Sequence, residues 1–347
     1  MKRISKFLFL TFLTFFIGSC GDKNTTANDL FSVEITNKKK TYKQEDELSV
    51  NINTKTGLEI ERVRYSIDNG KKIDGNSIPL TGQKMGKRIL HAFITSEGKE
   101  YELTQSFKIT ATTPPTLYTY KILESYPHDI KAYTQGLEFE NDTLYESTGQ
   151  YRQSSLRKTN YQTGEVLQKV ALADQYFGEG LTILDDKIYQ LTWRENTGFI
   201  YNTTTLEKKG TFVFDKSKEG WGLCHNNEHI FKSDGTEKIW TLNPKTLSEE
   251  SYIEIYTHNS VIDNVNELEW VNGKIYANIY QRDAIAIVNP ENGAVEGVIN
   301  MKGLQEEVTQ HTTLDVLNGI TYNGEPNILY VTGKNWDKLF KIEIIKK

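Results

Sequence analysis

The feature that most constrains the fold of this 347-residue sequence is a short motif that recurs through its last two thirds. In each copy a variable residue stands before Gly-Leu or a close equivalent, and successive copies begin 44, 42, 45 and 52 residues apart. The five copies are Gln135-Gly136-Leu137, Glu179-Gly180-Leu181, Trp221-Gly222-Leu223, Asn266-Glu267-Leu268 and Asn318-Gly319-Ile320.

Each motif is followed by a turn and then by an apolar residue next to an aromatic one. These pairs are Leu144-Tyr145, Ile188-Tyr189, Ile230-Phe231, Ile275-Tyr276 and Leu329-Tyr330. A third apolar segment follows, such as residues 199–201, and dipeptides such as Thr163-Gly164 lead towards a fourth. Units of about 40–50 residues with four short strands are typical of β-propellers. We therefore predict a five-bladed β-propeller over residues 116–347.

The last unit lacks sequence for an outer strand after Ile345. Residues 118–125 precede the first unit, and we expect them to supply that strand and close the ring. An open array of repeats is the alternative, but it would leave sheet edges exposed.

Residues 31–110 alternate apolar and polar positions in short runs, for example Val33 and Ile35, or Leu48, Val50 and Ile52. This pattern, broken by turn dipeptides, predicts a small immunoglobulin-like β-sandwich over residues 30–112. Pro114-Pro115 then reads as a stiff linker. The chain is thus expected to be all-β.

The N-terminus carries three cationic residues within its first six positions, and an apolar run over residues 7–17 follows. The run is too short to span a bilayer but suits a secretory signal. Gly18-Ser19-Cys20 resembles the lipobox of bacterial lipoproteins. We expect a lipoprotein signal peptide over residues 1–19, lipidation of Cys20, and a polar tether over residues 20–29. The expected location is the bacterial cell envelope, on the periplasmic or outer-membrane face. A plain signal peptide is the alternative.

Composition excludes several classes of protein. With 37% apolar residues and a mean hydropathy of −0.54, the chain is neither a multi-span membrane protein nor wholly disordered. A net charge of −5 offers no footprint for nucleic acid. Cys224 has no second cysteine to pair with once Cys20 is lipidated, so we expect it to be buried.

In a propeller the innermost strands line a central channel, and the residue before each Gly-Leu should project towards its axis. In this chain those residues are Gln135, Glu179, Trp221, Asn266 and Asn318. The loop after each second strand supplies a second ring, made of Trp193, Asp234, Tyr280 and Lys334. Such different side chains on a symmetric scaffold indicate a functional site.

The same segments resemble the plant-type glutaminyl cyclases, or glutaminyl-peptide cyclotransferases, which also occur in bacteria. The resemblance runs from about residue 118 to the C-terminus and rests on an ordered set of motifs. These include Tyr133-Thr134-Gln135-Gly136-Leu137, Phe177-Gly178-Glu179-Gly180-Leu181, Gly220-Trp221-Gly222-Leu223, Asn266-Glu267-Leu268 and Val331-Thr332-Gly333-Lys334.

The resemblance implies conversion of an N-terminal glutamine of a peptide to pyroglutamate, with release of ammonia and with no redox or organic cofactor. Glu179 matches the family's catalytic carboxylate and is the expected general acid/base. Asn266 and Lys334 match positions that stabilise the substrate amide as it becomes an oxyanion. Gln135 matches a position that contacts the substrate. The expected partners are peptides with N-terminal glutamine and a membrane, and the protein is expected to be a monomer.

An aromatic pocket is expected around the substrate amide, formed by Tyr133, Phe177, Trp193, Trp221 and Tyr280. Its apolar wall would raise the pKa of Glu179 towards neutrality. Tyr133 and Tyr280 depart from the phenylalanine and tryptophan of the plant enzymes. Trp240 and Trp270 are expected to belong to the core instead.

Several alternatives remain open at this point. Taken alone, Glu179 could cap a turn or pair with Lys334, and Lys334 could lie on the surface. The six histidines show no zinc-binding spacing, and we expect no catalytic metal, although a structural calcium ion on channel carbonyls would be invisible in the sequence. A non-catalytic propeller that binds peptide or glycan is the competing function, and the sandwich could itself carry an adhesive role.

Overall fold

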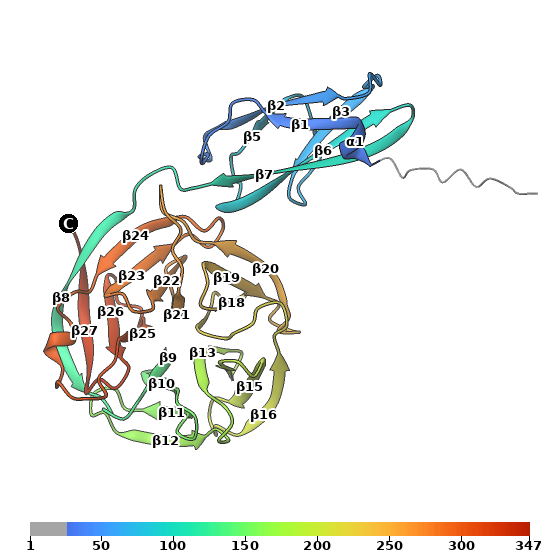
Figure 1. Ribbon diagram of the computed structural model, residues 1–347. Helices are drawn as coiled ribbons and strands as arrows, with labels where there is room; N and C mark the ends of the chain where they lie inside the picture. Colours follow the sequence, from blue (N-terminus) through green and yellow to red (C-terminus); the bar gives the residue numbers. More distant parts are fainter. Residues whose placement is uncertain (1–25) are drawn as a thin grey trace, which may run out of the picture.

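The computed structural model describes residues 26–347, which fold almost entirely into β-strands (Figure 1). The all-β prediction is therefore confirmed. Within these residues the helices are α1 (Ala27–Leu30) and the 3-10 turn η1 (Gln305–Glu307), and neither has the length needed to cross a bilayer. The predicted signal peptide and Cys20 lie outside the described residues.

The first part of the described chain consists of two small antiparallel sheets. Their strands are β1 (Phe31–Ile35), β2 (Glu47–Thr54), β3 (Arg62–Ile67), β4 (Ile73–Asp74), β5 (Ser77–Pro79), β6 (Gly86–Ser96) and β7 (Lys99–Ile109). One sheet has the order β1-β2-β5 and the other β4-β3-β6-β7. Alternate residues of β6, among them Leu90, Ala92 and Ile94, are fully buried in one hydrophobic core with Phe31 and Leu48. This core explains the period of two in the sequence.

The end of the predicted tether is helical. Thr26 and Asp29 form reciprocal hydrogen bonds that cap α1, with Thr26 N donating to Asp29 Oδ2 at 2.8 Å. Ala27 and Leu30 pack against the core of the first two sheets. The segment predicted as a tether over residues 20–29 therefore joins the folded part by residue 26.

Residues 116–347 form sheets arranged around a ring (Figure 1). The strands are β8 (Thr116–Pro127), β9 (Thr134–Glu140), β10 (Thr143–Thr148), β11 (Ser155–Thr159), β12 (Val166–Ala171), β13 (Gly178–Leu184), β14 (Lys187–Thr192), β15 (Thr197–Asn202), β16 (Lys208–Val213), β17 (Leu223–His225), β18 (Ile230–Ser233), β19 (Lys238–Leu242), β20 (Glu249–Glu254), β21 (Val265–Val271), β22 (Lys274–Ile279), β23 (Ala284–Val288), β24 (Val295–Asn300), β25 (Leu317–Thr321), β26 (Ile328–Gly333) and β27 (Lys338–Lys346).

Three of these sheets are four-stranded and antiparallel, with their strands in sequence order: β9 to β12, β13 to β16, and β17 to β20. An eight-stranded sheet contains the rest, in the order β21-β22-β23-β24-β8-β27-β26-β25. The first strands β9, β13, β17, β21 and β25 contact one another in a closed cycle at the centre of the ring.

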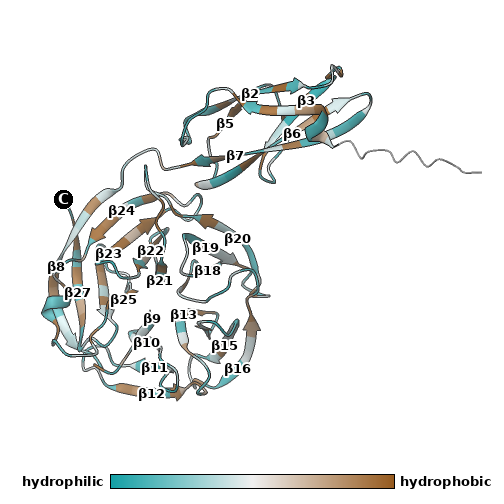
Figure 2. Ribbon diagram, in the orientation of Figure 1, coloured by the Kyte–Doolittle hydropathy of each residue, from teal (hydrophilic) through white to brown (hydrophobic). Residues whose placement is uncertain are grey.

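Apolar side chains fill the space between neighbouring sheets. Leu156 of β11 and Ile188 of β14 share one cluster, and Leu191 of β14 and Leu223 of β17 share the next. Figure 2 shows the resulting alternation of hydrophobic and hydrophilic residues along the strands. Burial of these side chains between sheets holds each sheet to its neighbour.

Strand β8 closes the ring. It pairs antiparallel with β27, with Phe340 opposite Ser125, and parallel with β24, with Val298 opposite Leu117. The prediction that residues 118–125 supply the strand beside the last repeat is confirmed by this pairing.

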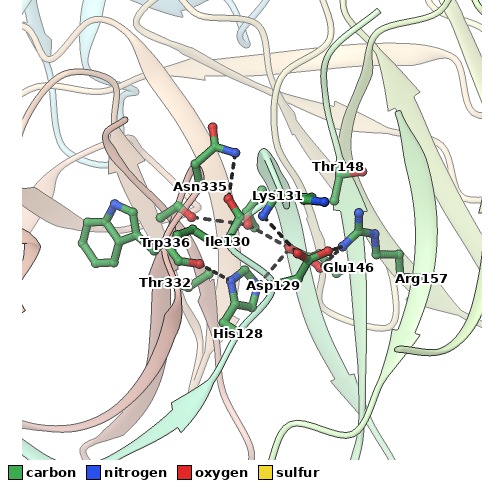
Figure 3. Close-up of polar contacts among 12 residues, drawn as sticks. His128, Asp129, Ile130, Lys131, Glu146, Thr148, Arg157, Thr332, Asn335 and Trp336 are labelled. Carbon is green, nitrogen blue, oxygen red and sulfur yellow. Dashed lines mark hydrogen bonds and ion pairs between the residues drawn. The ribbon is translucent and has the colours of Figure 1, made fainter. Parts of the chain in front are cut away.

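A buried polar network lies next to this closure (Figure 3). His128 Nδ1 contacts the backbone oxygen of Trp336 at 2.8 Å, and its Nε2 contacts Glu146 Oε1 at 3.1 Å. Arg157 Nη1 donates to Asp129 Oδ2 at 2.8 Å. Burial disfavours the charged imidazole, but the Glu146 carboxylate prevails and raises the pKa of His128. The network ties the segment before β9 to the turn after β26, which carries Lys334.

The first two sheets contact the ring near β20 and β24. Arg88 Nη2 of β6 lies 2.8 Å from Glu254 Oε2, and both residues are 7% exposed. Met85 N donates to Asn292 O at 2.7 Å, and Tyr256 joins the core of the first two sheets. The two parts of the chain therefore share a buried ion pair and part of one core.

Candidate active site

The recurring motif lies where each inner strand departs from regular pairing with its neighbour. In β13 the register jumps between Gly178, opposite Thr192, and Leu181, opposite Gln190, so that Glu179 and Gly180 fall in a β-bulge. The same jump includes Asn266 in β21 and Asn318 in β25. Bulges redirect side chains, so the residue before each Gly-Leu is turned out of the sheet at the same end of the ring.

Glycine follows the motif's first residue in four of the five copies, and Glu267 follows Asn266 in the remaining one; at Gly180 the neighbouring inner strands nearly touch. Gly180 N donates to Trp221 O at 2.6 Å, and a Cβ atom on Gly180 would lie 2.5 Å from the same oxygen. A side chain at this position would force the two strands apart. The glycine of the motif is therefore needed where two backbones approach closely, in addition to marking the repeat of the fold.

Polar residues of the second strands hold the bulges in place. Ser147 of β10 donates to the backbone oxygen of Glu179, and Ser233 of β18 donates to that of Asn266 at 2.6 Å. Asn278 of β22 accepts from Gly319 N at 2.9 Å. Each of these bonds links one four-strand unit to the bulge of the next, so the backbone beneath the site is fixed by the ring itself.

A cavity of about 210 Å³ opens at this end of the ring. Its lining residues are Tyr133, Gln135, Gln150, Phe177, Glu179, Trp193, Trp221, Asn266, Tyr280 and Lys334. All nine residues that the sequence analysis assigned to catalysis or substrate binding are in this set, and they come from all five repeats. The volume is below the roughly 300–1,000 Å³ of drug-sized ligand sites, so it suits a single small side chain.

Glu179 is 4% exposed, and no described residue donates a hydrogen bond to its carboxyl group. Burial raises its pKa well above the ordinary value. The cation of Lys334 opposes this shift, whereas the nearby carboxylates of Glu219 and Glu195 add to it. An unpartnered carboxyl group that faces a cavity and holds its proton to higher pH is suited to proton transfer.

Lys334 lies between two tyrosine rings. Its Nζ is 4.9 Å from the ring centroid of Tyr133 and 5.0 Å from that of Tyr280. The residue is 4% exposed, and burial lowers its pKa although Glu179 and Asp315 act in the opposite direction. Among the described residues it forms no ion pair within 4.0 Å, so its ammonium group is available to the cavity.

Asn266 is 1% exposed, and its Oδ1 is a buried atom without a hydrogen-bond partner among the described residues. A buried amide without partners is costly, and a polar ligand in the cavity would remove that cost. Gln135, in contrast, is fixed: its Oε1 accepts from Asn318 Nδ2 at 3.2 Å.

Glu219 joins the two indoles of the cavity wall. One oxygen, Oε2, accepts from Trp193 Nε1 at 2.8 Å and from Trp221 Nε1 at 2.9 Å. The other oxygen accepts from Arg194 Nε at 2.9 Å, and the Arg194 guanidinium lies 3.6 Å from the Trp193 ring centroid. Both indole planes are thus set by a single carboxylate.

The hydroxyl group of Tyr133 is directed away from the proposed chemistry. It donates to Asp315 Oδ2 at 2.7 Å, and burial together with this bond raises the pKa of the phenol. Tyr280 keeps the aromatic contact expected of its position, with its ring 5.6 Å from that of Trp221 and nearly perpendicular to it. Both departures from the plant pattern therefore preserve an aromatic wall.

Two channel positions of the sequence analysis do not line the cavity. Asn318 is buried and holds Gln135, and Asp234 accepts from Trp240 Nε1 at 2.7 Å. Both residues occupy the positions that the repeat pattern gave them, but their side chains form hydrogen bonds with other residues of the protein. Trp240 is buried as expected, and Trp270 is half-buried and stacked on Phe231. Cys224 is a free, buried cysteine.

Three further residues of the site were not found from the sequence: Gln150, Glu219 and Asp315. The second ring had no member from the first repeat, where Gly149 follows β10; the next residue, Gln150, has a φ of 85° and lines the cavity. No spacing signal marks Glu219 or Asp315. Among residues 26–347 no cluster of three or more His, Cys, Asp or Glu side chains is arranged to hold a metal ion.

Comparison with known proteins identifies the family of the chain. Residues 94–344 match the family model described as glutamine cyclotransferase, and the chain belongs to that family. It is 38% identical over 227 residues to a glutaminyl-peptide cyclotransferase of Arabidopsis thaliana, which covers 65% of this chain and 71% of the relative. It is also similar to the crystal structure of Myxococcus xanthus glutaminyl cyclase, with a TM-score of 0.62 and 30% identity, over 67% of this chain and 99% of the other.

Proposed function

We propose that this protein is a glutaminyl-peptide cyclotransferase, which converts the N-terminal glutamine of a peptide to pyroglutamate and releases ammonia. The observation that carries the proposal is the buried, unpartnered carboxyl group of Glu179 in a cavity the size of one side chain. Membership of the glutamine cyclotransferase family supports the same reaction.

The reaction needs one proton carrier. The neutral α-amine of the substrate attacks the side-chain carbon of the amide, and a five-membered ring forms through a tetrahedral intermediate. Glu179 takes a proton from the attacking nitrogen and gives it to the leaving nitrogen, so that ammonia departs and the enzyme ends in its starting state. Its raised pKa suits both halves of this transfer near neutral pH.

The intermediate carries a negative charge on the former amide oxygen. Lys334 Nζ and Asn266 Nδ2 are the proposed donors to that oxygen, because both side chains line the cavity. Fixed donors in a water-poor site stabilise a developing charge more than the ground state. Gln135, held by Asn318, is proposed to contact the substrate amine or backbone.

The aromatic side chains are proposed to bind the flat side-chain amide and to exclude water. The ring centroids of Trp193 and Phe177 lie 5.6 Å apart, and those of Trp221 and Tyr280, which also line the cavity, are likewise 5.6 Å apart. Water exclusion strengthens each electrostatic contact of the intermediate.

For the architecture we propose a five-bladed β-propeller over residues 116–347, preceded by an immunoglobulin-like sandwich over residues 30–112. The closed cycle of inner strands supports the first, with the eight-stranded sheet counted as two blades that meet at β8. The two sheets around one core support the second.

The lipid anchor at Cys20, a signal peptide over residues 1–19 and a position on the periplasmic or outer-membrane face of a bacterial cell envelope remain proposals from the N-terminal motif. Peptides with N-terminal glutamine are the proposed substrates. The proposed enzyme is a monomer that needs no metal or organic cofactor for this acyl transfer, with a structural calcium ion left open.

One assay tests the reaction. Purified protein is mixed with a glutamine-initiated peptide, and ammonia release is followed by a coupled reaction beside the mass change of the peptide. We expect turnover well above the spontaneous rate and none with an asparagine-initiated control. Absence of turnover above the spontaneous rate would refute the enzymatic function and favour a binding module.

A further inference from the structure

A second, larger cavity adjoins the first. Its volume is about 650 Å³, and it shares two lining residues, Tyr133 and Gln150, with the 210 Å³ cavity. Beyond these, its walls include Ile130, Lys131, Gln153, His311, Thr313 and Asn335. We call this second cavity the downstream groove. It lies between the first and the last repeat, on the side of the site formed by the segment before β9 and the turns around β25 and β26.

The proposed reaction dictates which part of a substrate enters the first cavity. The α-amine and the side-chain amide carbon must both reach Glu179, so the whole glutamine residue is taken up there. The α-carbonyl and every later residue must then leave the cavity on one side. The Trp193 and Trp221 side is closed by indoles held on Glu219. The Tyr133 and Gln150 side opens into the downstream groove.

We propose that the downstream groove binds the peptide residues that directly follow the N-terminal glutamine. The inference rests on the proposed function and extends it to a second binding site. The groove has about three times the volume of the cavity that receives one residue, so it has room for about three more. Its walls are mainly polar side chains, as suits an extended, hydrated peptide rather than an apolar ligand.

The floor of the groove is built in advance. Asn335 Nδ2 donates to Ile130 O at 3.1 Å, Asn335 N donates to Ala132 O at 2.8 Å, and Asn335 O lies 2.9 Å from His311 Nε2. Figure 3 shows Asn335 and Ile130 directly above the His128 and Glu146 network. A groove with fixed walls binds a peptide without an ordering cost of its own.

The same floor adjoins the reacting groups. Asn335 follows Lys334 in the chain, and Ile130 precedes Tyr133 by three residues. A peptide seated in the groove is therefore held by the segments that also hold Lys334 and its aromatic partner. Binding energy from such remote contacts can be used to orient the reacting amide, so that longer substrates gain in kcat as well as in KM.

The uncompensated charge of the groove is positive. Lys131 is exposed and forms no ion pair with any described residue. Asp315, which also lines the groove, accepts hydrogen bonds from Tyr133 and from Val316 N at 2.8 Å, and the nearby cation of Lys334 offsets its negative charge. The groove should therefore favour acidic over basic residues in the positions after the glutamine.

The test uses the full-length protein and a peptide series. For the amides of Gln-Ala, Gln-Ala-Ala, Gln-Ala-Ala-Ala and Gln-Ala-Ala-Ala-Ala, kcat/KM should rise with length and level off at about four residues, the number that fills both cavities. In a second series, Gln-Glu-Ala-Ala should be preferred over Gln-Lys-Ala-Ala by about threefold at low ionic strength, and salt should weaken the preference.

Charge reversal assigns the preference to the groove. Lys131→Glu should invert the preference between Gln-Glu-Ala-Ala and Gln-Lys-Ala-Ala. Arg282→Glu is the matched control, because Arg282 is an exposed cation that does not line the downstream groove. It should leave the preference intact.

Three results would overturn the proposal in distinguishable ways. If kcat/KM does not change with peptide length beyond the dipeptide, peptide binding in the downstream groove would be refuted, but the enzymatic function would not. An equal shift in both charge variants would attribute the preference to the overall field of the protein. Absence of turnover with every peptide would refute the proposed function, and the groove with it.

Discussion

Two carboxyl groups at the candidate site have opposite electrostatic environments. Burial without a hydrogen-bond partner raises the pKa of Glu179. Burial also disfavours the charge on Glu219, but hydrogen bonds from Trp221, Trp193 and Arg194 outweigh it and lower the pKa of that carboxyl. Because the pKa values of the two carboxyl groups are shifted in opposite directions, Glu179 can carry a proton while Glu219 stays charged and holds the indoles.

We expect Glu179→Gln to keep the fold and to lower kcat by at least ~10²-fold, the usual contribution of a positioned acid/base group. Ammonia release from a glutamine peptide measures the loss, and circular dichroism checks the fold. A near-normal rate in a folded variant would assign the proton transfer to another group.

The same variant should change the pH dependence of stability. A carboxyl whose pKa is raised in the folded state binds more protons when folded than when unfolded. Stability is therefore lost as pH rises above the unfolded value of 4.5. Glu179→Gln removes that loss, so its thermal midpoint should exceed that of the parent at pH 7–8, with the difference fading near pH 4. If the thermal midpoints of the two proteins differ by the same amount at every pH from 4 to 8, the raised pKa of Glu179 would be contradicted.

Glu219 acts through the indoles, and its variants should separate orientation from charge. Glu219→Ala frees both indoles and should raise KM by about tenfold. Glu219→Gln keeps an acceptor oxygen and should recover most of that KM. Because the Glu219 carboxylate helps to raise the pKa of Glu179, Glu219→Gln should also move the kcat profile towards lower pH.

An unchanged KM and pH profile in both variants would make Glu219 a structural residue only. Glu207→Ala, which removes an exposed carboxylate paired with Lys209, is the control for a general loss of charge.

At the level of the strand, the site depends on the β-bulge that repeats in the inner strands β13, β21 and β25. The bulge turns one side chain into the cavity, and the glycine beside it allows the neighbouring strand to come close. One local geometry thus presents Glu179 and Asn266 to the cavity from two different repeats and directs Asn318 to Gln135.

We expect Gly180→Ala to be destabilising by about 1–3 kcal/mol and to reduce activity, because the new methyl group would meet Trp221 O at 2.5 Å. Gly210→Ala in β16 is the matched control, since its Cβ would touch only Ile200 Cδ1 at 3.9 Å. Thermal unfolding and ammonia release measure both effects. Equal behaviour of the two variants would show that close strand approach is not what the motif preserves.

These strands also explain how far the sequence could be interpreted. The repeat period predicted the all-β fold and the closing role of residues 118–125, because burial between sheets imposes the same pattern on each unit. The motif also located Glu179 and Asn266, since the bulge recurs at a constant place. Glu219 could not be found in this way: its role depends on Trp193, which comes from another sheet, 26 residues earlier.

On the scale of the whole molecule, the first two sheets are joined to the ring by a largely buried interface. The side chains of Arg88 and Glu254 in its ion pair are 8% and 10% exposed. Glu254 Oε2 also accepts from Lys87 N at 2.8 Å. The interface lies on β20 and the following segment, outside the strands that carry the cavity.

Arg88→Met should lower the thermal midpoint strongly, because it leaves the Glu254 charge buried without its partner, a loss of about 3–5 kcal/mol. Activity at low temperature should be retained. Arg64→Met, which breaks the exposed pair with Glu100, is the control and should shift the midpoint far less. Calorimetry and the ammonia assay measure both variants. Loss of activity in folded Arg88→Met would give the first two sheets a part in catalysis.

The pairing of β8 with β27 has a consequence for biosynthesis. Among the strands of residues 116–347, β8 is synthesised first and β27 last. The ring can therefore close only after β27 has been synthesised. Lys334, four residues before β27, arrives at the same late moment. The nascent chain therefore carries the proposed proton carrier and most of the aromatic wall before it gains its cation, and catalytic competence should begin only after Lys334 and β27 have joined the ring.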